Sequence, residues 1–499
     1  MRKNLKNLFL ILLIILLSKY IQIIGLIFSF SKVEYYFFNV KDEKLKLKIN
    51  DKIKKIQLHI KTSIPKTFHL YNIENKFIDS FFISTGHIEK WLFYGFIVES
   101  NEMIIKIKKK ENDTASILIR GALLKFNNEE EIYVKAEDLK KFVEFDKEFK
   151  MRSKKLIPDL KSFFYNLSSS WDAYWYKSII LSGYSYDKNY YRKQNPQFAP
   201  LYPLLCKITS YFLKNTELSM IFVSNFLGLV AFYVIFFITY NLYGEKSAFR
   251  ILILYSLYPG ALFFTVPYSE STAVLISSIS FYFLIRKNYN LSFLLIGIGT
   301  AARFHLIFFS LSFLLIYIIY ERKNINILKI IFYFILTCSG ILIYSIYLWL
   351  KFKEPLAHYL LWKYAWGNEN GVMNFFKNLI FLFLIKEITI IPLQTYLVIF
   401  WLFYFSLRLY SKKFSTKDII FITSLIPFIG ILISTLSQGH PNVYLTSLPR
   451  FFYIIFPLFW VLERIMNSTQ ILIFSIIFAI MLFCHALFFN KISVFSYVP

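Results

Sequence analysis

Cysteine is scarce in this sequence. Cys206, Cys338 and Cys484 are scattered over 499 residues, and each lies in or beside an apolar segment. A disulfide framework or a zinc site needs several cysteines at short, regular spacings, and this odd, dispersed set offers neither. We therefore expect the three thiols to pack as small hydrophobic groups among helices.

Acidic residues are scarce relative to basic ones. The chain has 57 lysines and arginines against 31 aspartates and glutamates, which gives a formal net charge of +26 at pH 7. No basic helix stands out, because the lysines are spread over loops and over an N-terminal polar region. This distribution argues against a nucleic-acid-binding protein. Positive loops on one face of a membrane explain much of the excess.

Apolar sequence, by contrast, is abundant. Hydrophobic residues make up 56% of the chain and aromatic residues 20%, whereas soluble domains average roughly 45–50% apolar residues. The uncharged run over residues 219–240 is long enough to cross a hydrocarbon core, which takes about 20 residues as a helix. Because lipid offers the backbone no hydrogen-bond partners, such runs form helices. The sequence therefore predicts an all-α polytopic membrane protein.

The first apolar run covers residues 8–30 and follows Arg2, Lys3 and Lys6. A signal peptide would have a shorter apolar core and a small-residue cleavage site, and we see no such site here. We predict an uncleaved first transmembrane helix within residues 1–32, with its basic flank in the cytoplasm.

Residues 33–150 differ from the rest of the chain, because charged residues are dense and apolar ones alternate with period two. Alternation of this kind is typical of half-buried strands. It covers residues 44–50, 56–62, 103–110, 115–121 and 131–136. We predict a small all-β, sandwich-like extracytoplasmic domain inserted after the first helix. Residues 137–165 indicate a charged, partly helical connector back to the membrane.

Residues 151–499 form the predicted transmembrane region. Apolar runs predict helices at residues 217–241, 250–266, 270–286, 326–350, 388–410, 418–436, 449–464 and 470–490. The run over residues 291–320 is too long for one span and has Arg303 and His305 in its middle. A turn there would give two short helices.

The loop charges favour this hairpin. With a turn in the run, the basic loops at residues 286–287, 321–329 and 410–418 all lie on the cytoplasmic side, as the positive-inside rule requires. We therefore predict about 11 transmembrane helices, with the N-terminus inside and the C-terminus outside.

This topology places four polar segments on the outer face. They are residues 171–203, 266–271, 354–371 and 437–450. Each has charged or hydrogen-bonding residues among tryptophan, tyrosine and proline. Ionisable groups close to lipid are costly and are usually functional or paired. We therefore expect the four segments to share one cavity.

Asp172 lies in the first of these segments, between aromatic residues. A carboxylate at the membrane surface could act as a general base that takes a proton from a hydroxyl. The alternative is a structural role, in which Ser170 or Asp172 caps the helix that follows.

Five segments resemble, in the same order, the PIG-V family of mannosyltransferases that act second in GPI-anchor synthesis, together with its bacterial relatives. They are WDAYWYKSIILSGY with FAPLYPLL (171–184 and 198–205), SLYPGALFFTVPYSES (256–271), GIGTAARFHL (297–306), FKEPLAHYLLWKYAWG (352–367) and TSLPRFFYIIFPLFWVL (446–462). The resemblance covers the membrane part and leaves residues 33–150 unexplained. Ala199 and the pair Lys353 and Glu354 depart from the family pattern.

The resemblance implies a GT-C membrane glycosyltransferase. Its donor would be a polyprenyl-phosphate-linked sugar, its acceptor a glycan or glycolipid, and its active site would lie at the extracytoplasmic or lumenal face. Asp172 would be the general base of an inverting transfer of a hexose, expected to be mannose. We expect no metal and no other cofactor, because the leaving lipid phosphate already carries charge and no DxD-like cluster is present.

The other roles follow from the chemistry of this reaction. Arg303, His305 and Arg450 would bind the donor phosphate, since guanidinium groups bind phosphate bidentately and stay charged. Glu270 is a second catalytic candidate, which would orient the acceptor or pair with an arginine. The aromatic candidates for substrate binding are Trp171, Tyr176, Tyr184, Tyr202, Tyr268 and Trp366.

Five of these residues also have a structural alternative. Arg303 would be a satisfied arginine at a helix break, and Arg450 would extend to the membrane interface. Glu270 would cap the helix that follows Ser269. Tyr268 and Trp366 would belong to the aromatic belt at the interface.

The main rival function is a polytopic transporter or a flippase of lipid-linked glycans. Transporters often contain internal repeats, and none is visible in this sequence. For the enzyme we expect the donor, the acceptor and membrane lipids as partners, with an accessory membrane subunit as an open alternative and no nucleic acid. The location would be a cell inner membrane, or the endoplasmic reticulum membrane of a eukaryote.

Overall fold

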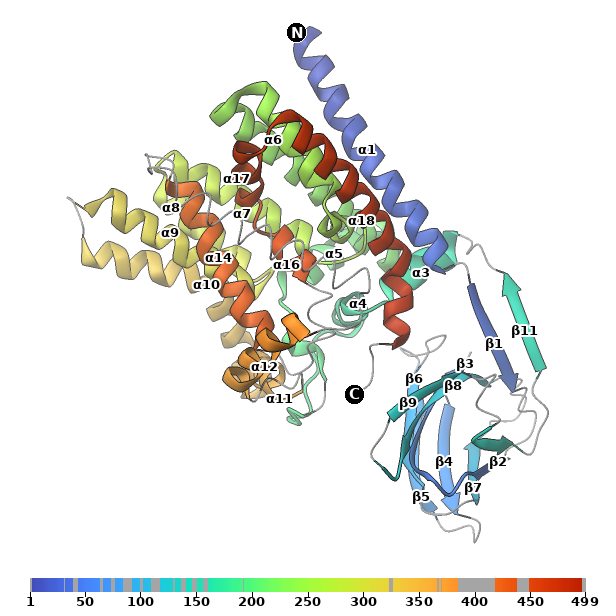
Figure 1. The fold of residues 1–499 in the computed structure, drawn as a ribbon. Coiled ribbons are helices and arrows are strands. Elements are labelled where there is room, and N and C mark those ends of the chain that lie inside the picture. The colour runs from blue at the N-terminus through green and yellow to red at the C-terminus, as the bar shows by residue number, and fades with distance from the viewer. Residues whose placement is uncertain are drawn as a thin grey trace. The chain divides into compact units, whose positions relative to one another are not determined.

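The fold was examined in a computed structural model. It describes residues 2–30, 32–38, 44–62, 66–72, 77–83, 92–98, 102–108, 117–128, 131–135, 141–145, 150–155, 160–191, 193–322, 326–365, 368, 370–384, 418–437 and 448–495. The chain divides into two units. One comprises Met1–Ser29 and Asp159–Tyr497 and is helical, and the other comprises Phe30–Pro158 and is built of strands (Figure 1).

The helical unit contains the following elements. The α-helices are α1 (Arg2–Phe30), α3 (Leu160–Ser168), α4 (Asp172–Ser182), α5 (Leu201–Leu213), α6 (Thr216–Leu257), α7 (Glu270–Ile285), α8 (Tyr289–Thr300), α9 (Ile307–Tyr320), α10 (Ile327–Phe352), α11 (Ala357–Tyr364), α12 (Gly371–Leu384), α14 (Asp418–Leu436), α16 (Leu448–Tyr453), α17 (Pro457–Ile465) and α18 (Ser468–Phe495). The 3-10 helices are η2 (Asn195–Gln197), η3 (Pro259–Phe264) and η4 (Phe304–Leu306).

Several of these helices are long apolar segments, as expected of a membrane protein. In the part of the chain that the structure describes, four are long and apolar enough to cross a membrane: Asn7–Ser29, Thr216–Leu257, Ile327–Phe352 and Ser468–Leu487. A mainly helical membrane protein is therefore confirmed, whereas the count of about 11 spans is not shown. The three cysteines are free thiols, and Cys206 is buried.

Most predicted helices correspond to helices of the structure. Helices α7, α10, α14 and α18 lie where the apolar runs predicted them. The predicted helix at residues 388–410 lies outside the described residues.

Two predicted helices are wrong in their extent. The predicted helix 250–266 ends as an α-helix at Leu257, and Pro259 begins η3. The predicted helix 449–464 is two short helices, α16 and α17, separated by residues 454–456. Pro457 begins α17, because a proline has no backbone N–H to donate and fits the first turn of a helix.

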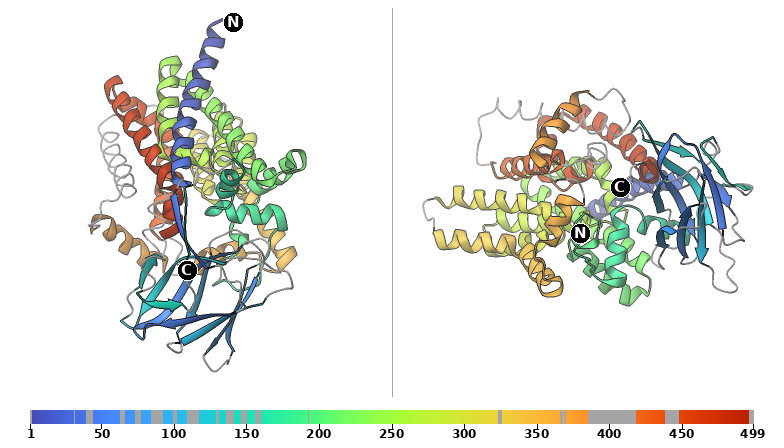
Figure 2. Two further views of the ribbon diagram at one scale, coloured as in Figure 1. Left: turned by 90° about the vertical axis from the view of Figure 1, so that its right-hand side faces the viewer. Right: turned by 90° about the horizontal axis from the view of Figure 1, so that it is seen from below.

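The predicted hairpin within residues 291–320 is confirmed. Helices α8 and α9 run antiparallel, because the first residue of α8 meets the end of α9: the Tyr289 hydroxyl donates to Glu321 Oε1 at 2.9 Å, and its ring lies 4.9 Å from that of Tyr317. Helix α10 packs beside both, as Figure 2 shows for α9 and α10. Gly297 and Gly340 allow the close approach of α8 and α10, since a Cβ on Gly340 would lie 2.5 Å from the carbonyl oxygen of Gly297.

The β unit consists of two antiparallel sheets. Its strands are β1 (Lys32–Phe38), β2 (Lys44–Ile49), β3 (Ile53–Thr62), β4 (Lys66–Asn72), β5 (Phe77–Ile83), β6 (Leu92–Ile97), β7 (Glu102–Lys108), β8 (Ile117–Phe126), β9 (Glu131–Lys135), β10 (Val143–Phe145) and β11 (Lys150–Lys155). One sheet has the order β11-β1-β8-β3-β6 with β9 paired to β8, and the other has the order β10-β2-β7-β4-β5.

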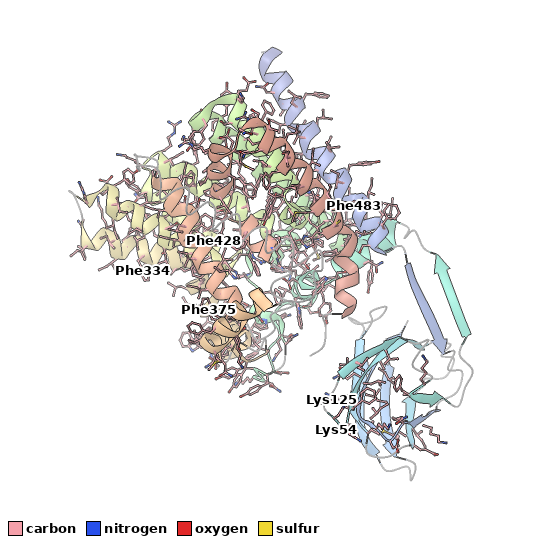
Figure 3. The ribbon with its side chains drawn as sticks, viewed as in Figure 1. Lys54, Lys125, Phe334, Phe375, Phe428 and Phe483 are labelled. Atoms are coloured by element: carbon pink, nitrogen blue, oxygen red, sulfur yellow. The ribbon has the colours of Figure 1, made fainter. Side chains whose placement is uncertain are left out.

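The period-two alternation correctly located strands in this unit. All five predicted segments are strands, namely β2, β3, β7, β8 and β9. Ile56 and Leu124 of one sheet and Met103 of the other are buried, while Lys54 is exposed. Figure 3 draws the side chains and labels Lys54 and Lys125 on the strands of this unit. The expected helical connector is wrong in part, because β11 pairs with β1 over six residues and helix begins only at Leu160.

Candidate functional site

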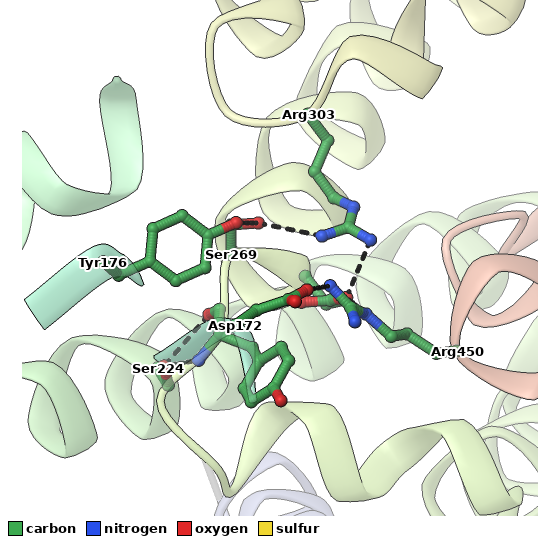
Figure 4. Close-up of polar contacts among 8 residues, drawn as sticks. Asp172, Tyr176, Ser224, Ser269, Arg303 and Arg450 are labelled. Carbon is green, nitrogen blue, oxygen red and sulfur yellow. Dashed lines mark hydrogen bonds and ion pairs between the residues drawn. The ribbon is translucent and has the colours of Figure 1, made fainter. Parts of the chain in front are cut away.

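Four charged side chains from four distant segments meet in the helical unit (Figure 4). Asp172 and Glu270 are the first residues of α4 and α7. Arg303 lies in the turn of the α8–α9 hairpin, and Arg450 belongs to α16. All four were candidate site residues on sequence grounds, and the structure brings them into direct contact.

Arg450 bridges the two carboxylates. Its Nη2 lies 2.5 Å from Asp172 Oδ2, and its Nε contacts Glu270 Oε1. Arg303 approaches the same oxygen of Glu270, with its Nη2 at 3.1 Å. The cluster thus contains two carboxylates and two guanidinium groups, and its formal charge sums to zero.

Burial differs within the cluster. The Glu270 side chain is 0% exposed and the two arginines 8–9%, whereas Asp172 is 31% exposed. Breaking one partner out of a buried ion pair leaves an uncompensated charge, which is strongly destabilising. Of the two acids, only Asp172 is partly exposed to solvent.

A tyrosine and a serine extend the cluster. The Tyr176 hydroxyl lies 2.9 Å from Ser269 Oγ, and Arg303 Nη1 donates to the same oxygen at 3.3 Å. Burial raises the pKa of Tyr176 to about 12, so its phenol is protonated at neutral pH. Tyr176 therefore acts here as a neutral hydrogen-bonding group.

Aromatic rings line the arginines. The Arg450 Cζ atom lies 4.7 Å from the ring centroid of Tyr268, and the Arg303 Cζ atom lies 5.3 Å from that of Phe451. The His305 ring stacks on the ring of Phe451, with 4.9 Å between the ring centroids. Cation–π contacts of this kind hold guanidinium groups in a fixed orientation.

The cluster contains polar atoms that are not satisfied within the described part of the chain. Glu270 Oε2, Arg303 Nε, Ser271 Oγ and Thr272 Oγ1 are buried and have no hydrogen-bond partner there. Buried polar groups in native proteins are nearly always paired, and exceptions point to strain, function or an absent ligand. This cluster therefore has unused capacity for a polar ligand.

The backbone before Asp172 is unusual. Trp171 has φ 52° and ψ −130°, a conformation that a bulky residue rarely adopts. Its indole nitrogen donates to the carbonyl of Phe489 at 3.1 Å, which holds the ring against α18. At the other end of α4, Gly183 has φ 74°, which glycine adopts without a steric cost. Strain of this type concentrates at functional sites.

The capping alternatives for the two acids are wrong. Trp171 is the N-cap of α4, and no side chain makes a capping hydrogen bond there. Ser170 instead donates to the carbonyl of Asn166. Ser269 precedes α7 and makes no capping bond either, while Glu270 pairs with the arginines.

The interface alternatives for Arg450 and Tyr268 are also wrong. Arg450 pairs inside the helical unit and is buried, and Tyr268 is 1% exposed. Arg303 does lie at a helix break, as its structural alternative required, but its Nε atom is buried without a hydrogen-bond partner in the described part of the chain.

The remaining aromatic candidates are Tyr202, Tyr184 and Trp366, and the structure describes the first two. Tyr202 packs on Tyr176 at 5.0 Å between ring centroids and hydrogen-bonds Ser224 at 2.9 Å, so it contacts the site through Tyr176. Tyr184 donates to the carbonyl of Phe198 at 2.8 Å. Trp366 lies outside the described residues.

Sequence reasoning missed Ser269 and Phe451. Each is the chain neighbour of a charged candidate, in the segments PYSES and LPRFF. Adjacency to Glu270 and to Arg450 was the signal that could have found them. No group of three or more histidine, cysteine, aspartate or glutamate side chains suited to a metal occurs among the described residues.

The chain matches no protein-family model, no curated protein and no solved structure.

Proposed function

We propose that the protein is a membrane glycosyltransferase that moves a hexose, expected to be mannose, from a polyprenyl-phosphate-linked donor to a glycan or glycolipid acceptor. The observation that supports this proposal best is the contact of Asp172, Glu270, Arg303 and Arg450. A partly exposed carboxylate beside two buried arginines offers a base and an anion site within one side-chain length of each other.

The proposed reaction is a single displacement with inversion. Asp172 takes the proton of the acceptor hydroxyl, and the hydroxyl oxygen forms a bond to the anomeric carbon. The bond from that carbon to the phosphate oxygen breaks, and its electron pair stays on the lipid phosphate. Arg303 and Arg450 stabilise the extra charge of the departing phosphate, and Glu270 holds the two guanidinium groups in place. The other proposed contacts, from His305 to the phosphate and from the aromatic candidates to the sugar, rest on the resemblance.

Donor binding would change the partners of Arg450. In the structure the Nη2 of Arg450 pairs with Asp172 and its Nε contacts Glu270. A lipid phosphate that takes a guanidinium edge displaces a carboxylate, and Asp172 is the more exposed of the two. The released Asp172 then becomes available as a base only when donor is present, which limits unproductive chemistry.

The finer architecture is part of this proposal. It comprises a GT-C-like arrangement of about 11 transmembrane helices and a site at the extracytoplasmic or lumenal face. Labelling of single introduced cysteines from either side of sealed membranes tests the face. We expect Arg286→Cys to react from the cytoplasmic side and Trp171→Cys from the outer side, and the reverse pattern would contradict the topology.

The proposal is tested with the full-length protein in vesicles that contain a polyprenyl-phosphate hexose. Transfer releases polyprenyl phosphate and yields a longer acceptor glycan, and Asp172→Asn should lower both by about 10²–10⁴. The rival transport function predicts a different outcome, in which the donor lipid changes leaflet while its sugar–phosphate bond stays intact. The acceptor is found by comparing membrane glycolipids and surface glycans of cells with and without the chain.

A further inference from the structure

Helix α1 carries a polar patch inside its apolar span. Ser18, Lys19 and Gln22 fall within Asn7–Ser29, and Ser18 and Gln22 are each 1% exposed. Lys19 Nζ donates to Asn225 Oδ1 at 2.9 Å and to Thr265 Oγ1 at 2.7 Å. Gln22 bonds the same threonine hydroxyl through its Oε1. The patch therefore joins α1 to α6 and to the segment that follows η3.

That segment, residues 265–268, is held at both of its ends. Asn225 Nδ2 donates to the Thr265 carbonyl at 3.0 Å. Ser224 Oγ donates to the Tyr268 carbonyl and accepts from the Tyr268 N–H, both at 3.1 Å, as Figure 4 shows. Ser269 and Glu270 follow directly in the chain. Thr265, which α1 contacts, thus lies five residues before Glu270, the residue that pairs with both arginines.

A lysine in this position is costly. An apolar helix that served only as an anchor has no need of an ammonium group in its span, and charged residues there usually mark function or a specific partner. The hydrogen-bond partners of Lys19 in the described part of the chain are a neutral amide and a neutral hydroxyl. Thr265 is the first residue of the segment 265–268, and Asn225 bonds the Thr265 carbonyl. Both contacts of Lys19 therefore hold the start of this segment.

We propose that Lys19 is a positioning residue, which braces residues 265–268 from α1 and thereby fixes where Ser269 and Glu270 face Arg303 and Arg450. Gln22 and Asn225 share the same brace. The consequence for turnover rests on the proposed function. The bracing itself does not, because it concerns only the order of the chain before Glu270.

The bracing is tested by thiol labelling of the full-length protein in membranes. Ser271→Cys is the reporter, because its hydroxyl is buried and makes no hydrogen bond in the described structure. Ser277→Cys, further along α7 and equally buried, is the matched reporter for general loosening. A membrane-permeant maleimide is used, and mass spectrometry assigns the label to each site.

Lys19→Met should accelerate labelling of Ser271→Cys by about tenfold and leave Ser277→Cys unchanged, because lost buried hydrogen bonds open the structure locally. Thr265→Val should give the same result, and Thr265→Ser, which keeps the hydroxyl, should behave like the unaltered protein. Tyr20→Phe is the control on α1, since Tyr20 is 63% exposed. Equal acceleration at both reporters, or none at either, would overturn the proposal.

Kinetics supply a second readout. If the protein transfers a hexose, Lys19→Met should lower kcat by about tenfold and leave KM for the donor nearly unchanged, since the brace orients groups rather than binding substrate. An unchanged kcat together with local loosening at Ser271→Cys would overturn the positioning role. Absence of transfer by the unaltered protein would defeat the proposed function, and the labelling result would still decide the brace.

Discussion

Two groups of ion pairs in the helical unit invite comparison. At one, Arg250 of α6 pairs with Glu463 of α17 at 3.3 Å. At the other, Glu270 faces both Arg303 and Arg450, and Arg450 also holds Asp172. Each group joins segments that are far apart in the sequence.

The two groups differ in how their polar atoms are satisfied. Glu463 Oε1 also accepts from Ser247 at 3.0 Å, and Arg250 donates to Ser468, so hydroxyls complete the first pair. In the second group, one oxygen of Glu270 receives both arginines while the other has no partner in the described structure. An ion pair whose polar atoms all have partners in the protein is typical of a structural contact. A buried pair with an unpartnered oxygen can still accept a hydrogen bond from a ligand.

Of the substitutions in the two groups, removal of the proposed base should lower the rate of transfer most. Asp172→Asn keeps the size and the hydrogen bonding of the side chain but cannot accept a proton at neutral pH. We expect transfer to fall by about 10²–10⁴ with the protein still folded. The measurement is release of polyprenyl phosphate in membranes at matched protein levels. Near-normal transfer would end the catalytic role of Asp172 and direct attention to Glu270.

The next largest effect should come from Arg450→Lys. Lysine keeps the charge but cannot contact Asp172 and Glu270 through two edges of one planar group. Loss of one charge-assisted hydrogen bond corresponds to about tenfold to a hundredfold in rate. Initial rates over a range of donor concentrations should show a higher KM and a lower kcat together. A change in neither would contradict the bridging role.

Tyr176→Phe should have a smaller effect on rate and a distinct one on pH dependence. Its hydroxyl bonds Ser269, and loss of such a bond costs about 0.5–1.5 kcal/mol. Burial raises the pKa of Tyr176 to about 12, above its ordinary value near 10. The folded state therefore holds this proton more tightly than the unfolded state between these two values.

The sign of the pH effect follows from that difference. Stability from this group is present below about pH 10 and is lost as the pH rises toward about 12, at up to about 1.4 kcal/mol per pH unit. Thermal unfolding in detergent should show a shallower alkaline loss for Tyr176→Phe than for the unaltered protein. Identical alkaline slopes would contradict the assignment.

The comparison pair should have the smallest effect on rate. Glu463→Gln removes the charge opposite Arg250, which is 22% exposed, and leaves a hydrogen-bonding side chain. We expect a modestly lower melting temperature and a transfer rate within about twofold of normal, because this pair is structural and partly solvated. A loss of rate as large as that of Arg450→Lys would erase the distinction between the two groups.

Part of the candidate site could be found in the sequence. Asp172 and Arg303 stood out because charged groups are rare next to apolar runs, and each then proved to belong to the cluster. Lys19 did not stand out in the same way, although it lies within the first apolar run. Its partners, Asn225 and Thr265, are more than 200 residues away, and no local pattern connects them.

Part of the fold was equally open to prediction. Period-two alternation located β2 and β3, and the charges of loops located the turn between α8 and α9. The break between α16 and α17 was not predicted, because the apolar run continues through residues 454–456 and only the tertiary packing interrupts it.

By itself, the amino-acid sequence indicated a mainly helical membrane protein, five of the strands of its β unit and the charged residues of the candidate site. These properties follow from composition and short-range periodicity, which act on neighbours in the chain. The tertiary structure alone decided that Arg450 would bridge Asp172 and Glu270, and that α1 would support the segment before Glu270. Both depend on side chains from remote helices meeting in a buried, low-dielectric interior, where an ionic group needs a partner and the fold selects which one.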